Sequence, residues 1–406
     1  MSANFKDIIP TSVYIHIPFC RRRCYYCDFP ISVVGDRGGK SASKMVEEYI
    51  AALIADIKLA PSIKQPVKTI FFGGGTPSLL SPSELSKIVR AIALQFGIAT
   101  DAEISMEIDP GTFSCDRLKG YLDAGLNRFS LGVQTFAPEL LKICGRSHTL
   151  DDVTEAVNII KQLNISNFSL DLISGLPYQT LEHCQTSLTK AVAIAPQHLS
   201  CYDLVLEPVT AFGKQYQPGK TPLPDDDDTA EMYRLTQQIL TAAGYQHYEV
   251  SNYAQAGYQC RHNRVYWTNQ PYYGFGMGAA SYVNGKRFTR PRTRREYYNW
   301  IEAGAIIDAP DITPTDYILE TLMLGLRLAE GIDTAQFERD TWQKIWSCLQ
   351  PYHLRGWIET VNHDGALVEE ENADRLLNSN AKIRLNDPEG FLFSNTILAT
   401  LFEKFE

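Results

Sequence analysis

The stretch YIHIPFCRRRCYYC, residues 14–27, places three cysteines close together, directly after a run of β-branched and aromatic residues. Cys20, Cys24 and Cys27 follow the spacing Cys-x3-Cys-x2-Cys. A structural zinc site normally takes four protein ligands, and no fourth ligand follows at zinc-finger spacing. Three thiolates on a [4Fe–4S] cluster leave one iron free to bind a small chelating molecule. The spacing therefore favours such a cluster. Zinc and uncoordinated thiols are the alternatives, and His16 is expected to pack beside the strand.

The bulk composition excludes several classes of protein. The chain has 406 residues and a net charge of −9, which argues against a broad nucleic-acid-binding face. No apolar run approaches the roughly 18 residues that a membrane span requires. Residues 1–12 lack the basic start and apolar core of a secretory signal. We therefore expect a cytoplasmic protein whose nine cysteines are not held in disulfides.

Short strand-like runs alternate with amphipathic segments from about residue 12 to about residue 254. The runs lie at residues 12–17, 68–75, 103–110, 128–134, 168–177, 199–205 and 247–253. Residues 45–57 and 151–163 show helical spacing, and Asp151 and Asp152 suit an N-cap. This alternation predicts parallel βαβ units. Six or seven units indicate a partial (β/α)6-type barrel.

The predicted barrel occupies residues 1–255. A connecting segment follows over residues 256–304, and a small domain over residues 305–406. Helical patterns and one possible hairpin, near residues 366–370 and 381–385, indicate a winged-helix-like α+β fold for this C-terminal domain. That fold alone does not define a function.

Barrel geometry predicts where the chemistry lies, because functional groups gather at the carboxyl ends of the strands. Those ends carry the three cysteines, the turn at residues 73–76, Glu107, Gln134 and Asp171. Glycines in the turn would let a ligand approach the backbone closely, and no Gly-Lys-Ser/Thr follows to make it a phosphate loop. Each polar group alone could be a structural hydrogen-bonding residue. Together they predict a site for a polar small molecule.

The residues just described resemble the radical S-adenosylmethionine (radical SAM) superfamily, and within it the anaerobic coproporphyrinogen III oxidase family. The resemblance covers most of the chain. It implies that the amino and carboxylate groups of S-adenosylmethionine chelate the open iron, and that a reduced cluster cleaves this molecule to a 5′-deoxyadenosyl radical. It also implies a carboxylate partner for Arg146. The residues expected to line the S-adenosylmethionine site are Tyr14, Tyr26, Gly74, Gly75, Thr76, Glu107, Gln134, Arg146 and Asp171.

Two departures separate this sequence from the oxidase pattern. The oxidases carry a further cysteine two residues after the third, where this chain has Phe29. They also carry an N-terminal arm, whereas the first strand here is expected near Ser12. Both departures weaken the case for decarboxylation of coproporphyrinogen III.

A third motif resembles the HemW-type haem chaperones, a branch of the same family. The segment HNRVYW holds His262, Asn263, Tyr266 and Trp267. The resemblance implies that His262 ligates haem iron, for which imidazole is a common axial ligand, and that the aromatic rings flank the macrocycle. The alternative is a histidine that simply packs in the core.

The last candidate feature is a basic segment at residues 285–298, with Lys286, Arg287, Arg290, Arg292, Arg294 and Arg295. It could bind haem propionates or lie solvated. We therefore expect a haem chaperone that binds haem, a [4Fe–4S] cluster and S-adenosylmethionine. It would need a haem-accepting protein and an electron donor for the cluster. Coproporphyrinogen III oxidation is the second hypothesis, and radical modification of tRNA is a remote third.

Overall fold

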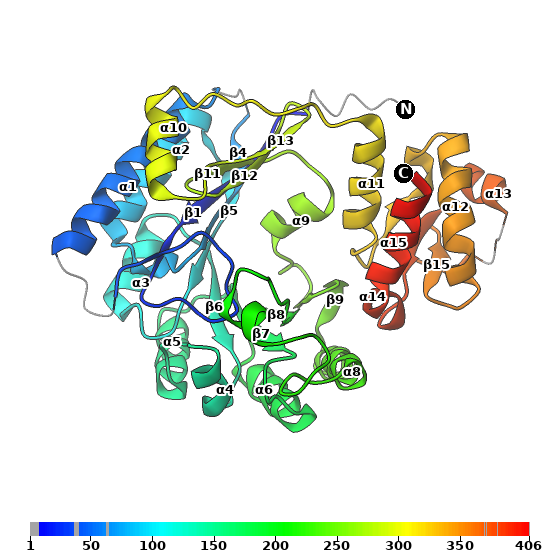
Figure 1. Cartoon of the computed structure of the whole chain (residues 1–406), viewed down its shortest axis with the longest axis horizontal. Coiled ribbons are helices and arrows are strands. Elements are labelled where there is room, and N and C mark those ends of the chain that lie inside the picture. The colour runs from blue at the N-terminus through cyan, green and yellow to red at the C-terminus, as the bar shows by residue number, and fades with distance from the viewer. Residues whose placement is uncertain are drawn as a thin grey trace.

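The computed structural model of the chain describes residues 8–35, 40–61, 65–368, 370, 372–379 and 381–405. Figure 1 shows a large body of strands and surrounding helices beside a smaller, mostly helical body. The helix α9 lies between the two. No helix in the described ranges is long and apolar enough to cross a membrane.

The large body is built on one curved sheet. Within the described residues it has nine strands in the order β11-β1-β4-β5-β6-β7-β8-β10-β9. Six of them follow one another in sequence and pair in parallel. They are β1 (Ser12–Ile17), β4 (Val67–Gly74), β5 (Ile98–Ile108), β6 (Arg128–Gln134), β7 (Phe168–Ser174) and β8 (His198–Asp203). These strands confirm the expected (β/α)6-type radical SAM fold.

Helices connect these strands or follow the last of them, and they cover the outside of the sheet (Figure 1). They are α1 (Lys40–Leu59), α2 (Pro82–Phe96), α3 (Cys115–Asp123), α4 (Pro138–Ile143), α5 (Leu150–Gln162), α6 (Leu181–Ile194), α7 (Ala211–Gln215) and α8 (Asp226–Ala242). The predicted N-cap of α5 was wrong. Thr149 is the N-cap, because its hydroxyl accepts from the Asp152 N–H while Asp152 Oδ2 accepts from the Thr149 N–H at 2.7 Å. This reciprocal arrangement is a capping box.

The last strands of the sheet differ from the sequence prediction. Residues 247–253 do not form one further parallel strand. They split into β9 (Gln246–Glu249) and β10 (Asn252–Ala254), which pair antiparallel, and β10 also pairs antiparallel with β8. The seventh parallel strand is β11 (Tyr273–Phe275), which pairs with β1 from the far end of the chain. Its three residues include Gly274, so it offers little strand signal.

Residues from the predicted connecting segment also enter the main core. Tyr273, Phe275, Met277 and Tyr297 belong to the same buried cluster as the barrel strands. The two-stranded ladder of β12 (Ala280–Val283) and β13 (Lys286–Thr289) follows β11, and α10 (Arg294–Glu302) packs on α1. The three-way division of the chain at residues 255 and 304 stays a prediction.

The C-terminal body has its own apolar core, with Trp342, Ile345, Leu349, Ile383 and Ile397 at its centre. Its helices are α11 (Pro314–Gly325), α12 (Arg339–His353), α13 (Ala373–Asn378), α14 (Glu389–Leu392) and α15 (Ser394–Phe405). They pack on a small antiparallel sheet ordered β14-β16-β15, formed by β14 (Ile332–Asp333), β16 (Lys382–Leu385) and β15 (Ile358–Val361). The mixed composition agrees with the expected α+β domain.

The hairpin expected in this domain is wrong in one strand. β16 pairs with β15 and β14, not with residues 366–370. In that segment an isolated bridge joins Leu367 to Val361, and residue 369 lies outside the described residues. The segment 358–361 is the better strand because Ile358, Thr360 and Val361 are buried against the core.

Candidate cluster and cofactor site

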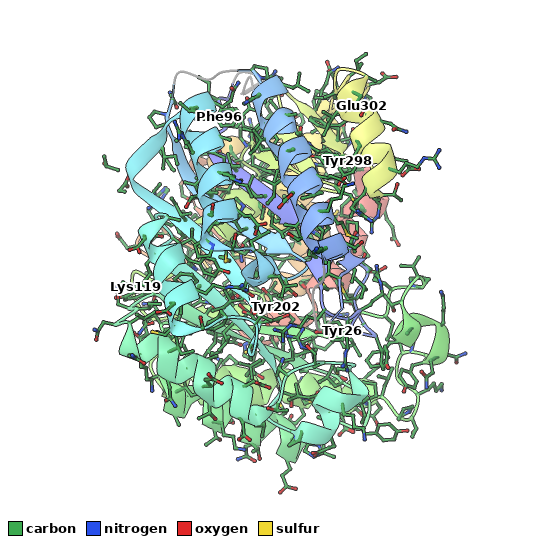
Figure 2. All side chains as sticks on the ribbon, turned by 90° about the vertical axis from the view of Figure 1, so that its left-hand side faces the viewer. Tyr26, Phe96, Lys119, Tyr202, Tyr298 and Glu302 are labelled. Carbon is green, nitrogen blue, oxygen red and sulfur yellow. The ribbon has the colours of Figure 1, made fainter. Side chains whose placement is uncertain are left out.

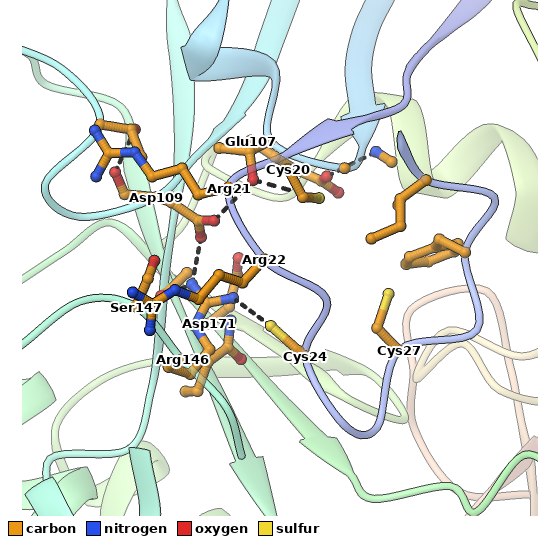
Figure 3. A pocket seen from close by; sticks show the side chains of 18 of the residues that line it. Cys20, Arg21, Arg22, Cys24, Cys27, Glu107, Asp109, Arg146, Ser147 and Asp171 are labelled. Carbon is orange, nitrogen blue, oxygen red and sulfur yellow. Dashed lines mark hydrogen bonds and ion pairs between the residues drawn. The ribbon is translucent and has the colours of Figure 1, made fainter. Parts of the chain in front are cut away.

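A cavity of about 220 Å³ opens at the carboxyl ends of the barrel strands. The cysteine loop forms one wall, and the ends of β4 to β8 form the other (Figure 3). All the predicted cluster and S-adenosylmethionine residues line it except Tyr14: Cys20, Cys24, Cys27, Tyr26, Gly74, Gly75, Thr76, Glu107, Gln134, Arg146 and Asp171. The structure thus brings together, in one cavity, residues that are spread over about a third of the sequence.

The three thiols do not form a site for a single metal ion. In the described part of the chain, no group of three or more histidine, cysteine or acidic side chains is placed to hold a single metal ion. This argues against the zinc alternative, which requires ligands that converge on one point. A [4Fe–4S] cluster binds each cysteine at a different iron and does not need its ligands to converge on one atom.

The protein around the thiols also fits iron bound by thiolates. Burial raises the pKa of Cys20 to about 12 and the pKa of Cys27 to about 11. Both groups are therefore neutral thiols at pH 7 unless a metal displaces their protons. Thr76 Oγ1 donates to Cys20 Sγ at 3.7 Å, and Arg146 Nη1 donates to Cys24 Sγ at 3.6 Å. Such donors would stabilise the thiolates that a bound cluster creates.

Arg146 is a buried cation with an unused donor. Its Nη2 pairs with Asp109 Oδ1 and also donates to the Gly132 carbonyl at 3.1 Å. Its Nε is buried and has no hydrogen-bond partner in the described part of the chain. A buried donor without an acceptor costs free energy. An anionic group in the cavity, such as the carboxylate of S-adenosylmethionine, would satisfy this donor.

Two carboxyl groups also line the cavity. Glu107 Oε2 accepts from the Gly74 N–H at 3.0 Å, and Asp171 accepts from Ser130 Oγ at 2.8 and 2.9 Å. Burial and then the nearby Asp171 raise the pKa of Glu107 to about 8, and burial raises the pKa of Asp171 to about 6. A ligand with ammonium or hydroxyl donors would stabilise the charged forms. The predicted ligand carries both kinds of donor.

Several lining residues were not anticipated. Asp109 accepts from Thr76 Oγ1 at 3.0 Å and pairs with Arg146, so it joins two predicted residues. It lies two residues after Glu107, and this second acid past the strand was a signal available in the sequence. Ser130 on β6 and Tyr202 on β8 also line the cavity. Their positions depend on strand register, so no local pattern marks them.

Tyr14 and His16 lie beneath the cavity on β1. The Tyr14 hydroxyl donates to His16 Nδ1 at 3.1 Å, and His16 Nε2 donates to the Pro30 carbonyl at 3.0 Å. Burial lowers the pKa of His16 to about 4. Both ring nitrogens of His16 are therefore occupied, which agrees with the expected packing role. A place for Tyr14 in the S-adenosylmethionine site stays a prediction.

Known proteins resemble the chain along nearly its whole length. A family model described as the Radical SAM superfamily matches residues 14–191, and one described as the HemN C-terminal domain matches residues 312–388. The heme chaperone HemW of Synechocystis sp. is 48% identical over 98% of both chains. The heme chaperone HemW of Escherichia coli is 39% identical over 81% of this chain and 85% of its own. The chain belongs to the HemW family.

The fold agrees with this membership. The coproporphyrinogen III oxidase (HemN) of Escherichia coli, described as a radical SAM enzyme, superimposes with a TM-score of 0.80 over 98% of this chain and 91% of its own. Its sequence is only 22% identical, so the match establishes the shared fold alone. Phe29, the residue that replaces the further cysteine of the oxidase pattern, lines the cavity with 52% of its surface exposed.

The motif that resembles the HemW branch forms α9 (Arg261–Trp267), outside the cavity. His262 is only 1% exposed. Its Nδ1 lies 2.8 Å from Thr69 Oγ1, its Nε2 lies 2.8 Å from the Tyr266 hydroxyl, and its ring stacks on Phe71. Burial lowers the pKa of His262 to about 3. Asn263 and Trp267 are half-buried on the same helix. In this structure His262 is thus a satisfied packing residue, and its role towards haem stays a prediction.

Half of the six basic residues in the segment at residues 285–298 form ion pairs. Arg290 pairs with Asp56 at 2.7 Å in the core, Arg287 with Glu320 at 2.8 Å, and Lys286 with Asp311 at 3.7 Å. Arg292 donates to the carbonyl of Asp28 in the cysteine loop at 2.9 Å. The segment is therefore neither a simple solvated loop nor a set of unengaged cations, and its structural contacts leave little of it for haem propionates.

Proposed function

We propose that this protein binds haem and passes it to a haem-accepting protein in the cytoplasm, while carrying a [4Fe–4S] cluster and S-adenosylmethionine at the barrel mouth. The observation that carries the proposal is the 48% identity over 98% of both chains to a curated heme chaperone HemW. The fit of the cavity residues to the cluster and its ligand supports it independently.

Within this proposal the residues of each cavity wall bind a different group. Cys20, Cys24 and Cys27 hold the cluster, which when bound supplies a one-electron centre and an open iron position. Arg146 Nε, buried and without an acceptor, receives the carboxylate of S-adenosylmethionine. Glu107 and the Gly74 backbone, already hydrogen-bonded to each other, orient its ammonium group. The buried position of these groups strengthens each interaction, because water screens them poorly there.

The haem site is proposed around α9, which lies between the barrel and α11 (Figure 1). Asn269, just after α9, donates to Thr321 Oγ1 on α11 at 3.2 Å. Arg264 on α9 pairs with Glu330 at 2.5 Å. Haem ligation by His262 requires that its Nε2 exchange the Tyr266 hydroxyl for iron. Because Tyr266 lies on the same helix as His262, this exchange requires the Tyr266 side chain to turn away from the imidazole.

Haem titration of three proteins tests this assignment. We expect the wild type to take up haem with a Soret band, and His262→Ala to lose uptake or change the spectrum. Tyr266→Phe is the matched control, because it keeps the ring but releases Nε2 of His262, so uptake should persist or strengthen. Transfer of haem to an acceptor apoprotein is then followed by absorbance. An unchanged spectrum in His262→Ala contradicts the ligand assignment, and no uptake by the wild type contradicts the chaperone.

The second candidate function is oxidation of coproporphyrinogen III. The whole-chain fold match to the Escherichia coli oxidase favours it, whereas Phe29 at the position of the further cysteine opposes it. The N-terminal arm cannot decide the question, because residues 1–7 lie outside the described residues. Consumption of coproporphyrinogen with release of carbon dioxide by the reduced, reconstituted protein would establish this alternative.

A further inference from the structure

A second hollow lies on the outer side of the cysteine loop. It has a volume of about 660 Å³ and is bounded by that loop, by α4 and by the start of α5. Gly145, Arg146 and Ser147 line both this hollow and the cofactor cavity. The hollow is therefore separated from the cluster site by a thin wall of protein.

The walls of this hollow are positively charged on a negatively charged chain. Arg22, Arg23 and Lys142 are exposed on its rim, and Asp151 is the one exposed acid among its lining residues in the described chain. His148 also lines it, and burial lowers the pKa of this histidine to about 4, so it is neutral at pH 7. The chain as a whole carries a net charge of −9. The hollow is thus a positively charged surface on a chain whose net charge is negative.

The wall between the hollow and the cluster site is formed by Tyr25, Gly145 and Arg146, and Arg146 contacts the proposed cluster ligand Cys24. Tyr25, next to Cys24 in sequence, is 48% exposed, and its N–H donates to the Cys144 carbonyl at 3.1 Å. A Cβ atom added at Gly145 would lie 3.3 Å from the Tyr25 ring, so this ring rests on the glycine backbone. Arg146 spans the remaining distance, because its Nη1 donates to Cys24 Sγ at 3.6 Å (Figure 3).

We propose that this hollow docks an acidic one-electron carrier protein that reduces the cluster. The net negative charge of the chain would repel an acidic carrier. The positive rim of the hollow would instead attract it, at a place that only a thin wall separates from the cluster site. One electron leaves the flavin hydroquinone of such a carrier, which becomes the semiquinone, and the cluster passes from its 2+ to its 1+ state. The inference rests on the cluster of the proposed function and identifies the kind of partner that reduces it.

Lys142 is the residue to change, because it lines this hollow but not the cofactor cavity. Arg23 is left intact, since its Nη1 donates to the Cys27 and Phe29 carbonyls within the cysteine loop at 3.3 Å. The matched control is Lys119→Glu, the same charge reversal on α3. Lys119 lies well apart from Tyr26, a residue of the cysteine loop, in Figure 2.

The experiment uses the full chain with its cluster reconstituted and its iron counted. Photoreduced flavodoxin serves as the acidic probe, dithionite as the small reductant, and the flavin absorbance reports electron transfer in a stopped-flow instrument. Binding of oxidised flavodoxin is titrated separately at two salt concentrations. We expect Lys142→Glu to slow reduction by flavodoxin several-fold at the lower salt concentration. Binding should weaken in parallel, with a smaller salt dependence.

Reduction by dithionite separates the possible outcomes. Equal dithionite rates in all proteins, with slower flavodoxin reduction only in Lys142→Glu, support the docking surface. Equal flavodoxin rates and salt dependence in Lys142→Glu and Lys119→Glu overturn it. A wild type that dithionite reduces but flavodoxin neither binds nor reduces also overturns it, and so does displacement of flavodoxin by tRNA, which would assign the hollow to nucleic acid. A protein without iron contradicts the proposed function instead.

Discussion

Replacement of Arg146 by lysine is expected to weaken S-adenosylmethionine binding without unfolding the protein. Lysine keeps a positive charge beside Asp109 but lacks the planar fork of guanidinium, so the buried Nε donor disappears. A hydrogen bond to a charged group contributes about 1.5–3 kcal/mol. Its loss corresponds to a roughly 10- to 150-fold higher dissociation constant. Without ligand, the change also removes an unsatisfied buried donor, so the free energy of unfolding should fall by no more than about 1 kcal/mol.

Calorimetric titration of S-adenosylmethionine into the reconstituted protein measures this effect, with iron content and urea unfolding recorded for each protein. Arg117→Lys is the control, because Arg117 donates to the Ser78 and Thr112 carbonyls but does not line the cavity. A dissociation constant within about twofold of the wild type, at equal iron content, would refute the assignment of Nε. Loss of iron in Arg146→Lys would show that this residue acts through its contact with Cys24.

Two further predictions concern stability. Asp56→Ala leaves the Arg290 guanidinium buried without its carboxylate, since the pair is 2% and 4% exposed, and should cost about 3–5 kcal/mol in urea unfolding. The double variant with Arg290→Met should recover most of this loss, and a cost below about 1 kcal/mol contradicts the reasoning. Burial raises the pKa of Glu249 from 4.5 to about 7. The native state therefore holds a proton that the unfolded chain releases, and the free energy of unfolding should fall as pH rises from 4.5 to 7. Glu249→Gln should flatten this part of the urea midpoint profile, and an unchanged slope contradicts it.

The amino-acid sequence by itself determined the barrel and the composition of its mouth. The six parallel strands follow from local runs of β-branched and aromatic residues separated by helical periodicity, and each run supplies its own carboxyl end. Because parallel strands place those ends on one edge, Cys20, Glu107, Gln134 and Asp171 were bound to meet once the strand order was right. The cysteine spacing predicted the cluster loop in the same way, because the number of thiol ligands in one loop can be counted in the sequence.

The tertiary structure alone decided which polar groups are already engaged. His262 reads in sequence as an available imidazole, yet Thr69 and Tyr266 occupy both of its nitrogens. Arg290 reads as an exposed cation, yet Asp56, 234 residues away in sequence, pairs with it in the core. β11 is too short to be recognised alone and is a strand because β1 lies beside it. These features depend on contacts between segments that are distant in sequence. Such contacts form only when the chain folds, so no local pattern in the sequence predicts them.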